Sequence, residues 1–530
     1  MTMQPVLIAG EWRTSISSGS FQAENPATQE KLAAQFPVST WADCEAALAA
    51  AATAAEELQK LPAERIAEFL EAFAKRIEAR KDDFVKIANQ ESALPVAPRL
   101  ADAEFPRTTN QLRQAAAAAR DGSWTQPTID AAANIRSVLA PIGPVLVFGP
   151  NNFPFAFNSA AGGDFAAAIA AGNPVIAKAN TSHPGTTQLF AEEALAALKE
   201  TNLPLATVQL IYRTSHADGE KLVADHRVGA IGYTGSRNAG LKLKAAADAV
   251  GKPFYAELSS VNPVVILPGA IAEKSADIAG QFTSSCLMGV GQFCTNPGLI
   301  VLLANPNTEA FISEITTKFG AAPVGTLLSS SVASSLTKAV TTLQSAGAKL
   351  LVGGTAGGGK GYSHANTLLR VDGSHFVKNA TALQTEAFGN ASLLVVCADL
   401  AEAANVLRQL EGNLTGCIYS SKIVSDDAAY AQLAPILRQK VGRLLDDKMP
   451  TGVAVSPAMN HGGPFPATGH PGFTAVGIPA SLRRFAALHC YDGVRDNRLP
   501  ASLQNKNPSG KLWRQINNSW SQADVLPLPQ

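Results

Sequence analysis

The sequence predicts an α/β protein with two parallel-sheet domains. Short apolar runs alternate with amphipathic or alanine-rich runs along most of the chain, as in sheets with crossover helices. The chain has 530 residues, which is more than one hydrophobic core normally organises, so at least two domains are expected. Hydrophobic residues make up 46% and charged residues 16% of the sequence, a balance that fits a large, well-buried globular protein.

Helices are expected before the first sheet begins. Residues 63–80 carry apolar side chains at helical spacing, with Glu and Arg on the other face. Residues 40–60 are rich in alanine and predict a second helix. The apolar positions of the helix predicted at 63–80 are Ile66, Phe69, Leu70, Phe73 and Ile77.

The first parallel sheet is predicted from residue 137 onward. Four apolar runs look like buried strands, and helical runs lie between them, which is the signature of a parallel sheet with crossover helices. The predicted strands are 145–148, 175–177, 208–211 and 228–231.

A second series of strands and helices begins near residue 262, so the boundary between the two domains is expected near residue 260. Its predicted strands are 262–267, 350–352 and 393–396, and its predicted helices lie near 272–288, 308–319 and 330–346.

Charge and cysteine usage exclude several classes of protein. Lys plus Arg and Asp plus Glu each number 43, so the zero net charge gives no support for binding nucleic acid or an anionic membrane. We expect no signal peptide at the N-terminus and no membrane span, since no apolar run reaches ~20 residues. The six cysteines form no CxxC pair, which favours neither a zinc site nor a disulfide framework and predicts a cytoplasmic protein.

Three side chains stand out as carriers of chemistry. Cys294 lies in Gly-Val-Gly-Gln-Phe-Cys-Thr-Asn-Pro-Gly, directly after a helical run. Glu257 follows a short strand-like run, and Asn152 follows the strand that ends at Phe148. A cysteine thiolate is a nucleophile, a carboxylate can activate water, and a side-chain amide can donate to an oxyanion. In this order, the three groups can oxidise an aldehyde.

These motifs resemble the aldehyde dehydrogenase superfamily, from about residue 25 to about residue 490. The resemblance implies a Rossmann-like cofactor domain, a catalytic domain and a small β arm that adds strands to a neighbouring subunit of a homodimer or homotetramer. Proline and asparagine cluster after Leu499, so an extended C-terminal tail is expected. The expected parts are 1–132 and 150–260 for the cofactor domain, 261–477 for the catalytic domain, 133–149 and 478–500 for the arm, and 501–530 for the tail.

The resemblance assigns roles to the three side chains. Cys294 is the nucleophile, Asn152 holds the oxyanion, and Glu257 activates the water that hydrolyses the thioester; no metal is required. The family usually has two glycines after the Glu-Leu pair, whereas this chain has Ser259 and Ser260. This departure can restrict how Glu257 swings.

The nucleotide site is expected at a strand–turn–helix junction, because the chain has no GxGxxG motif. Gly235, Ser236 and Gly240 resemble the family's Gly-Ser-x-x-x-Gly turn, where the first helical N–H groups meet a pyrophosphate. Residues 354–360 resemble a phosphate loop, but Gly361 stands where Ser or Thr would ligate magnesium, so we interpret them as a turn.

Cofactor preference is predicted from residues near the expected adenosine ribose. Lys178 matches the family's ribose-binding lysine. Three residues later, NAD-preferring relatives often carry glutamate, whereas this chain has Thr181. Arg213 can supply a countercharge to a 2′-phosphate, so NADP is the expected cofactor, with NAD also possible. Within the resemblance, Glu386 binds the nicotinamide ribose and Phe388 packs near the nicotinamide ring.

Residues 460–469 resemble the branch of the family that oxidises 2-oxoglutarate semialdehyde, as do residues 152–157 and 162–164. Phe465 is a candidate for the wall of the substrate tunnel. An anionic aldehyde would need an arginine or backbone donors at the tunnel mouth. The arginines available from this part of the sequence are Arg443, Arg483 and Arg484.

The sequence leaves other functions open. The chain can be a dehydrogenase with broad specificity for fatty or aliphatic aldehydes, or one that transfers the acyl group to CoA, although Glu257 favours hydrolysis. A cysteine hydrolase needs a histidine partner, and none of the eight histidines marks itself as one. A catalytically silent binding protein with the same fold is the remaining alternative.

Overall fold

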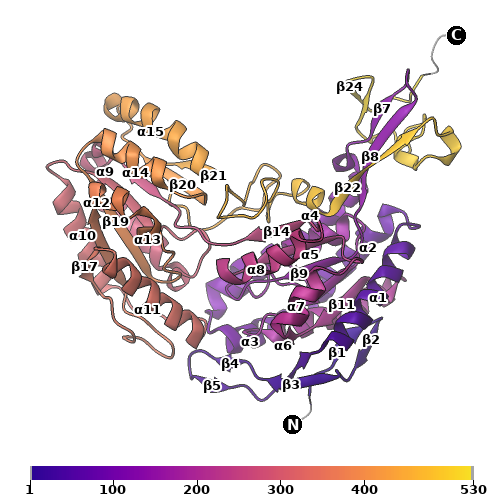
Figure 1. Cartoon of the computed structure of the whole chain (residues 1–530), viewed down its shortest axis with the longest axis horizontal. Coiled ribbons are helices and arrows are strands. Elements are labelled where there is room, and N and C mark those ends of the chain that lie inside the picture. The colour runs from indigo at the N-terminus through magenta and orange to yellow at the C-terminus, as the bar shows by residue number, and fades with distance from the viewer. Residues whose placement is uncertain (1–2, 527–530) are drawn as a thin grey trace.

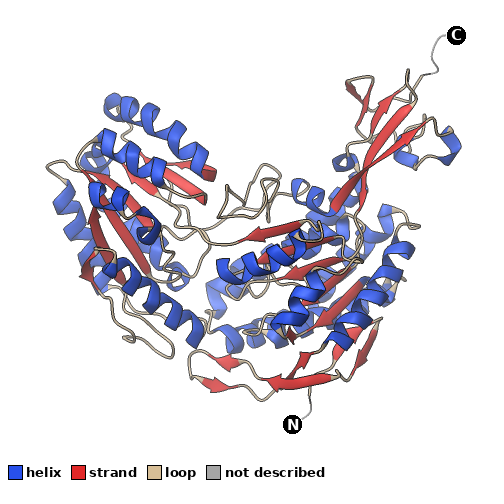
Figure 2. Cartoon of the chain, in the orientation of Figure 1, coloured by secondary structure: helices blue, strands red, loops and turns tan. Residues whose placement is uncertain are grey.

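The structure is a computed structural model that describes residues 3–526. It has two seven-stranded sheets, each packed against helices, and a five-stranded arm that projects away from the first sheet (Figures 1 and 2). This architecture confirms the α/β fold with two parallel-sheet domains expected from the sequence. Within residues 3–526, no helix is long and apolar enough to cross a membrane.

The first sheet has five parallel strands at one side, extended by an antiparallel pair from the N-terminus. The five apolar positions expected on one face of α2 are all buried in its core. In sheet order the strands are β14 (Phe254–Glu257), β13 (Ala230–Thr234), β9 (Val145–Phe148), β10 (Val175–Lys178), β11 (Val208–Ile211), β1 (Val6–Ile8) and β2 (Glu11–Arg13). The helices of this part are α1 (Trp41–Leu58), α2 (Ala63–Ala79), α3 (Lys81–Ser92), α4 (Phe105–Asp121), α5 (Gly163–Ala170), α6 (Pro184–Glu200), α7 (His216–Val223) and α8 (Arg237–Asp248).

The second sheet is parallel except for β17, which pairs antiparallel with β18 at one edge. In sheet order its strands are β17 (Lys349–Val352), β18 (Thr367–Asp372), β19 (Ala391–Cys397), β16 (Leu299–Leu303), β15 (Val264–Ile266), β20 (Asn413–Tyr419) and β21 (Val441–Asp446). Its helices are α9 (Pro268–Leu287), α10 (Thr308–Ala321), α11 (Ser330–Ser345), α12 (Gly373–Lys378), α13 (Ala380–Leu383), α14 (Leu400–Gln409) and α15 (Asp427–Lys440). Residues 354–360 connect the antiparallel strands β17 and β18 rather than a strand and a helix, so they do not form a phosphate loop.

The arm corrects two expected boundaries. β9 was assigned with residues 133–149 to the arm, but it pairs with β10 and β13 inside the first sheet. Part of the expected tail 501–530 instead forms strands of the arm, because β23 pairs with β7 and β24. In sheet order the arm contains β22 (Ala486–Asp492), β8 (Ile135–Pro141), β7 (Thr128–Asp130), β23 (Arg514–Ile516) and β24 (Ser519–Ser521).

Small strands complete the N-terminal part of the chain. They are β3 (Ser17–Phe21), β6 (Phe36–Ser39) and β12 (Arg213–Thr214) in one sheet, and β4 (Glu24–Asn25) and β5 (Glu30–Lys31) in another.

A long irregular segment joins the second sheet back to the arm. Residues 447–479 contain neither helix nor strand, and Figure 1 shows this yellow segment lying between the two lobes. The residues that follow it pack against the first lobe. There, the buried Arg484 donates to Asp164 on α5 across 2.8 Å, which ties the end of the segment to the first sheet.

We expect Asp164→Asn to destabilise the protein, because it leaves the charge of Arg484 buried without a counterion. Breaking a buried ion pair in this way typically costs about 3–5 kcal/mol. The free energy of unfolding in urea measures the effect. Asp83→Asn is the matched control, since Asp83 forms an exposed pair with Arg80 worth about 0–1 kcal/mol. Equal effects of the two substitutions would contradict the assigned role of the buried pair.

Candidate active site

Cys294 lies just after a tight turn at the end of α9. The turn is the 3₁₀ segment Met288–Gly291, in which Gly289, Val290 and Gly291 have φ values of 55°, 59° and 68°. A Cβ at Gly291 would lie 2.0 Å from the carbonyl oxygen of Gly389, so only glycine fits there. This turn brings the cysteine from the second lobe to the junction with the first.

Glu257 reaches the same junction from the first lobe. It is the last residue of β14 and is 1% exposed. The loop around residues 460–469 lies along this strand end, since Leu258 N–H donates to Ala467 O and Gly469 N–H donates to Ala256 O, both at 2.8 Å. A buried carboxylate is thereby held against a loop that comes from the other lobe.

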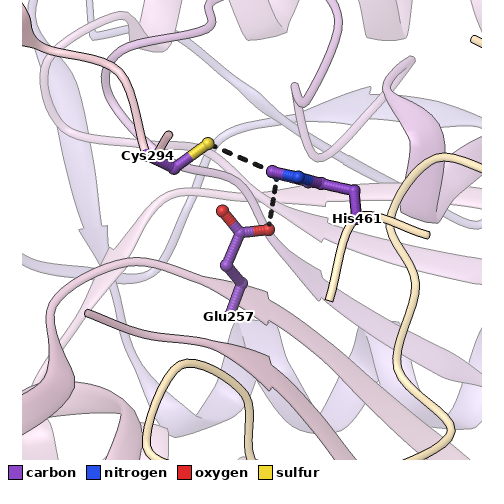
Figure 3. A group of neighbouring side chains, drawn as sticks. All are labelled: Glu257, Cys294 and His461. Carbon is purple, nitrogen blue, oxygen red and sulfur yellow. Dashed lines mark hydrogen bonds and ion pairs between the residues drawn. The ribbon is translucent and has the colours of Figure 1, made fainter. Parts of the chain in front are cut away.

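His461 connects the thiol and the carboxylate. Its Nε2 lies 3.3 Å from Cys294 Sγ and 3.2 Å from a carboxylate oxygen of Glu257 (Figure 3). The imidazole is 1% exposed, and its ring centroid lies 5.9 Å from that of Phe157. The sequence expectation that no histidine marks itself as a partner of Cys294 is therefore corrected.

Sequence reasoning missed His461 because it lies 167 residues from Cys294, in a segment with no helical or strand periodicity. Its position is fixed by long-range backbone contacts: its N–H donates to Thr474 Oγ1 at 3.1 Å, and its carbonyl accepts from Ala475 N–H at 3.0 Å. The one available signal was the unusual 460–469 element, which begins one residue before His461.

The electrostatics of the site keep the thiol protonated at rest. Burial raises the pKa of Cys294 well above its ordinary value, and the nearby Glu257 carboxylate raises it further, while Arg107 acts in the opposite direction. A thiol of this kind needs a base to become a nucleophile. His461 Nε2, 3.3 Å from the sulfur, is placed to accept the S–H proton.

Asn152 is anchored to the turn that carries Cys294. Its buried side-chain amide donates to the carbonyl of Gln292 at 3.0 Å, two residues before Cys294. Its own carbonyl accepts from the Arg99 guanidinium at 2.9 Å. Because an amide NH₂ has two hydrogens, one remains to donate to an oxyanion.

The expected pyrophosphate turn lies between β13 and α8. Ser236 is the N-cap of α8, but its hydroxyl makes no capping hydrogen bond, and the first turn contains no acidic residue. A Cβ at Gly240 would lie 2.4 Å from a methyl carbon of Leu258, so glycine allows the helix to approach the strand. Gly235 precedes Ser236 in the same turn. These features fit a dinucleotide phosphate bound at the positive helix end.

Lys178 and Arg213 lie at the ends of neighbouring strands. Lys178 is the last residue of β10, and Arg213 begins β12, two positions after the last residue of β11. Burial lowers the pKa of Lys178 to about 8, and the positive charge of Arg213 contributes to this shift. Thr181 is exposed in the loop that follows Lys178. Lys178 and Arg213 make this edge of the sheet basic, and the loop residues 179–183 after Lys178 include no carboxylate.

A cavity of about 350 Å³ extends from the start of α8 toward Glu386. Its lining includes Arg237, Ser259, Ser260 and Glu386. Burial raises the pKa of Glu386 to about 7, while Ser260 and Ser259 act in the opposite direction. The serines that replace the family's usual glycines therefore contact the wall where the nicotinamide ribose is expected.

Phe388 and Phe465 lie on different sides of this region. Phe388 lines a small pocket together with Glu386, Phe293 and other residues near Cys294, and its place beside the nicotinamide stays a prediction. Phe465 is 59% exposed, and its ring centroid lies 6.0 Å from the Arg237 guanidinium. A place for Phe465 in the substrate tunnel stays a prediction.

A sequence model of the aldehyde dehydrogenase family matches residues 12–434. The chain belongs to the aldehyde dehydrogenase family. Alpha-ketoglutaric semialdehyde dehydrogenase 2 of Azospirillum brasilense is 38% identical over 521 residues, which cover 96% of this chain and 98% of the relative. Alpha-ketoglutaric semialdehyde dehydrogenase of Acinetobacter baylyi is 33% identical over 509 residues, which cover 94% of this chain and 95% of that protein.

Solved aldehyde dehydrogenase structures share the fold. Lactaldehyde dehydrogenase from Escherichia coli superposes with a TM-score of 0.77 at 20% identity, covering 92% of this chain and 98% of that chain. A mutant of aldehyde dehydrogenase C from Pseudomonas syringae, in complex with NAD+ and octanal, gives a TM-score of 0.79 at 20% identity, covering 94% and 98%. As an aldehyde dehydrogenase, the chain is an oxidoreductase that acts on aldehydes.

We expect Zn²⁺ to inhibit this aldehyde dehydrogenase by binding the three groups of Figure 3. The ligand atoms of Glu257, Cys294 and His461 all lie within 4.8 Å of one another, and thiolate, imidazole and carboxylate are ligands that Zn²⁺ prefers. Activity titrated with Zn²⁺ should fall at low micromolar concentration and return after EDTA. His461→Ala should raise the half-inhibitory concentration roughly 10-fold or more. An unchanged concentration in that variant would contradict the proposed ligand set.

Proposed function

We propose that this aldehyde dehydrogenase oxidises 2-oxoglutarate semialdehyde to 2-oxoglutarate, with NADP as the preferred cofactor. The observation that carries the chemistry is the short chain of contacts from Cys294 through His461 to Glu257 at the junction of the two lobes. The substrate assignment is supported by the two relatives named for alpha-ketoglutaric semialdehyde, an older name for the same aldehyde.

The first chemical step forms a bond between Cys294 Sγ and the aldehyde carbon. His461 Nε2 takes the thiol proton, and Glu257, 3.2 Å away, stabilises the imidazolium that results. The aldehyde oxygen becomes an oxyanion, to which the second amide hydrogen of Asn152 and the Cys294 N–H can donate. The product of this step is a thiohemiacetal on the cysteine.

The cofactor, when bound, accepts the hydride whose loss converts the thiohemiacetal into a thioester. The residues proposed to hold it are Lys178, Thr181 and Arg213 at the adenosine end, Gly235, Ser236 and Gly240 at the pyrophosphate, and Glu386 and Phe388 at the nicotinamide end. In the last step Glu257 removes a proton from water, the hydroxide attacks the thioester, and the acid leaves as the Cys294 sulfur is released.

NADP preference is supported by charge. A 2′-phosphate needs cationic partners and no nearby carboxylate. Lys178 and Arg213 lie close enough for their charges to interact, and Thr181 offers a hydroxyl where a glutamate would repel the phosphate. These cations and the β13–α8 turn belong to the first lobe, so we assign that lobe as the Rossmann-like cofactor domain.

The arm is the proposed oligomerisation element. It projects from the first lobe (Figure 1) and presents several large apolar side chains to solvent, which is unfavourable for a monomer. A homodimer or homotetramer would cover them. The exposed apolar residues of the arm region are Ile135, Leu488, Trp513 and Trp520.

The assignment to the cytoplasm is supported by the six cysteines, all of which are free thiols.

Steady-state oxidation of 2-oxoglutarate semialdehyde, compared with a panel of simple aldehydes and with NADP against NAD, tests the proposal. We expect the highest kcat/KM for this substrate with NADP. Better turnover of long aliphatic aldehydes would contradict the substrate assignment but keep the chemistry of Cys294. Reduction of neither cofactor with any aldehyde would contradict the proposal as a whole.

We expect Glu257→Gln to slow hydrolysis more than acylation. The amide cannot remove a proton from water, whereas in acylation only the stabilisation of the His461 imidazolium is weakened. Stopped-flow measurement should show a burst of about one NADPH per active site, followed by steady-state turnover roughly 100-fold slower or more than wild type. Glu309→Gln, at an exposed pair with Arg370, is the control and should leave both phases unchanged. Equal loss of burst and turnover would contradict the role of Glu257 in hydrolysis.

NADP binding should weaken as pH rises through the pKa of Lys178. This pKa is lowered to about 8, so the ammonium is charged below that pH and neutral above it. The dissociation constant for NADP should rise roughly tenfold between about pH 7 and about pH 9, and that for NAD should rise less. Calorimetric titration of both cofactors measures the difference. Parallel curves for NADP and NAD would contradict a 2′-phosphate site at Lys178.

A further inference from the structure

Two arginines without an acidic partner lie near enough to Cys294 for their charges to interact with it. Arg107 is on α4, and its charge interacts with those of Cys294 and Glu257. Arg443 is on β21, and its charge also interacts with that of Cys294. In residues 3–526, neither guanidinium has an Asp or Glu oxygen within ion-pair distance.

Both arginines bind the same short stretch of backbone. Arg107 Nη1 donates to Val453 O at 3.1 Å. Arg443 donates to Pro450 O at 2.8 Å and to Gly452 O at 3.3 Å. The two guanidiniums therefore approach one segment from different lobes, and that segment belongs to the irregular loop that also carries His461 (Figure 1).

An aromatic wall separates Arg107 from the thiol. The guanidinium carbon of Arg107 lies 5.3 Å from the ring centroid of Phe157 and 5.9 Å from that of Phe153. The ring of Phe157 faces His461, and the ring of Phe153 contacts Phe293, next to Cys294. A short apolar chain lying on these rings would have its reacting end at Cys294 and its other end near the cations.

The hydrogen-bonding capacity of the two arginines is incompletely used. Arg107 Nη2 and Arg443 Nε are buried and have no hydrogen-bond partner among the described residues. Burial lowers the pKa of both guanidiniums, although arginine stays charged in proteins. A buried cation with an unpaired donor is costly unless an anion binds it.

We propose that Arg107 and Arg443 bind the carboxylate of the substrate, so that the enzyme selects short aldehydes with a carboxylate at the end remote from the aldehyde. The inference rests on the proposed function for the identity of that substrate. The donors left for the carboxylate are Arg107 Nη2 and Arg443 Nε, because the Nη groups of Arg443 already donate to the loop. Charge-assisted hydrogen bonds of this kind are the strong ones. The other arginines that the sequence offered do not fit: Arg484 is paired with Asp164, and Arg483 is exposed on the segment Ala480–Phe485.

The experiment compares 2-oxoglutarate semialdehyde with pentanal, a neutral aldehyde of the same carbon number, in wild type, Arg107→Met and Arg443→Met. The ratio of the two kcat/KM values should fall about 100-fold in each variant. Both arginines also act on the Cys294 thiol, so turnover of pentanal can fall as well, and the ratio isolates recognition of the carboxylate. Arg438→Met is the matched control, because Arg438 also donates to a backbone carbonyl, and its ratio should equal that of wild type.

A binding measurement keeps the test independent of turnover. In a Cys294→Ala background, calorimetry should show that 2-oxoglutarate binds roughly 10-fold or more weakly after either arginine is replaced, while NADP affinity is retained as a check of folding. Arg107→Lys and Arg443→Lys should restore part of the affinity, since charge remains but the guanidinium donors are lost.

The outcomes separate this inference from the proposed function. If wild type rejects 2-oxoglutarate semialdehyde but prefers succinate semialdehyde to butanal, and the Met variants lose that preference, the substrate assignment fails and the arginine site stands. If wild type prefers 2-oxoglutarate semialdehyde and the Met variants keep the same ratio, the arginine site is overturned and the proposed function stands. No preference of wild type for any carboxylate-bearing aldehyde would also overturn the arginine site.

Discussion

The active site depends on the seating of residues 460–469 against the end of β14. Two backbone hydrogen bonds, Leu258 N–H to Ala467 O and Gly469 N–H to Ala256 O, fix this loop to the first lobe, although it leaves the second sheet and returns to the arm. Without that contact, His461 would not be held beside Glu257 and Cys294. The buried pair of Arg484 and Asp164 holds the following residues to the same lobe, so it supports the loop from its other end.

The charges around the thiol explain why a base is needed there. Burial and Glu257 both oppose ionisation of Cys294, and Arg107 only partly offsets them. A protonated thiol is protected from oxidation, but it is a poor nucleophile. His461 can resolve this conflict because it takes the proton at the moment of attack, and the adjoining Glu257 stabilises the imidazolium that forms. In the proposed mechanism the same carboxylate then serves the hydrolytic step, so one buried pair would support two successive steps of the reaction.

Local patterns predicted much of this molecule. The apolar spacing of Ile66 to Ile77 predicted α2, and the buried runs predicted β9, β10 and β11, because each depends on a few consecutive residues. The motifs around Asn152, Glu257 and Cys294 likewise predicted a site whose family the comparisons establish. The pairing of β23 with β7 and the contact of His461 with Cys294 were missed, since each joins segments more than a hundred residues apart. The boundary that placed 145–149 in the arm was also wrong, although the strand itself was predicted. The sequence named Arg443 as an arginine available to an anionic substrate, but it did not place it near Cys294. Arg107 was recognised only from the structure, because it is far from Cys294 in the sequence.

The most direct test of the account is the pH dependence of Cys294 alkylation by iodoacetamide, followed at the Cys294 peptide by mass spectrometry in wild type and His461→Ala. Four other cysteines are buried and Cys490 is exposed, so a Cys490→Ser background removes the main competing thiol. The account predicts that His461→Ala slows alkylation near neutral pH roughly 10-fold or more and moves its midpoint to higher pH. Identical rates and midpoints in the two proteins would contradict the claim that His461 activates the nucleophile.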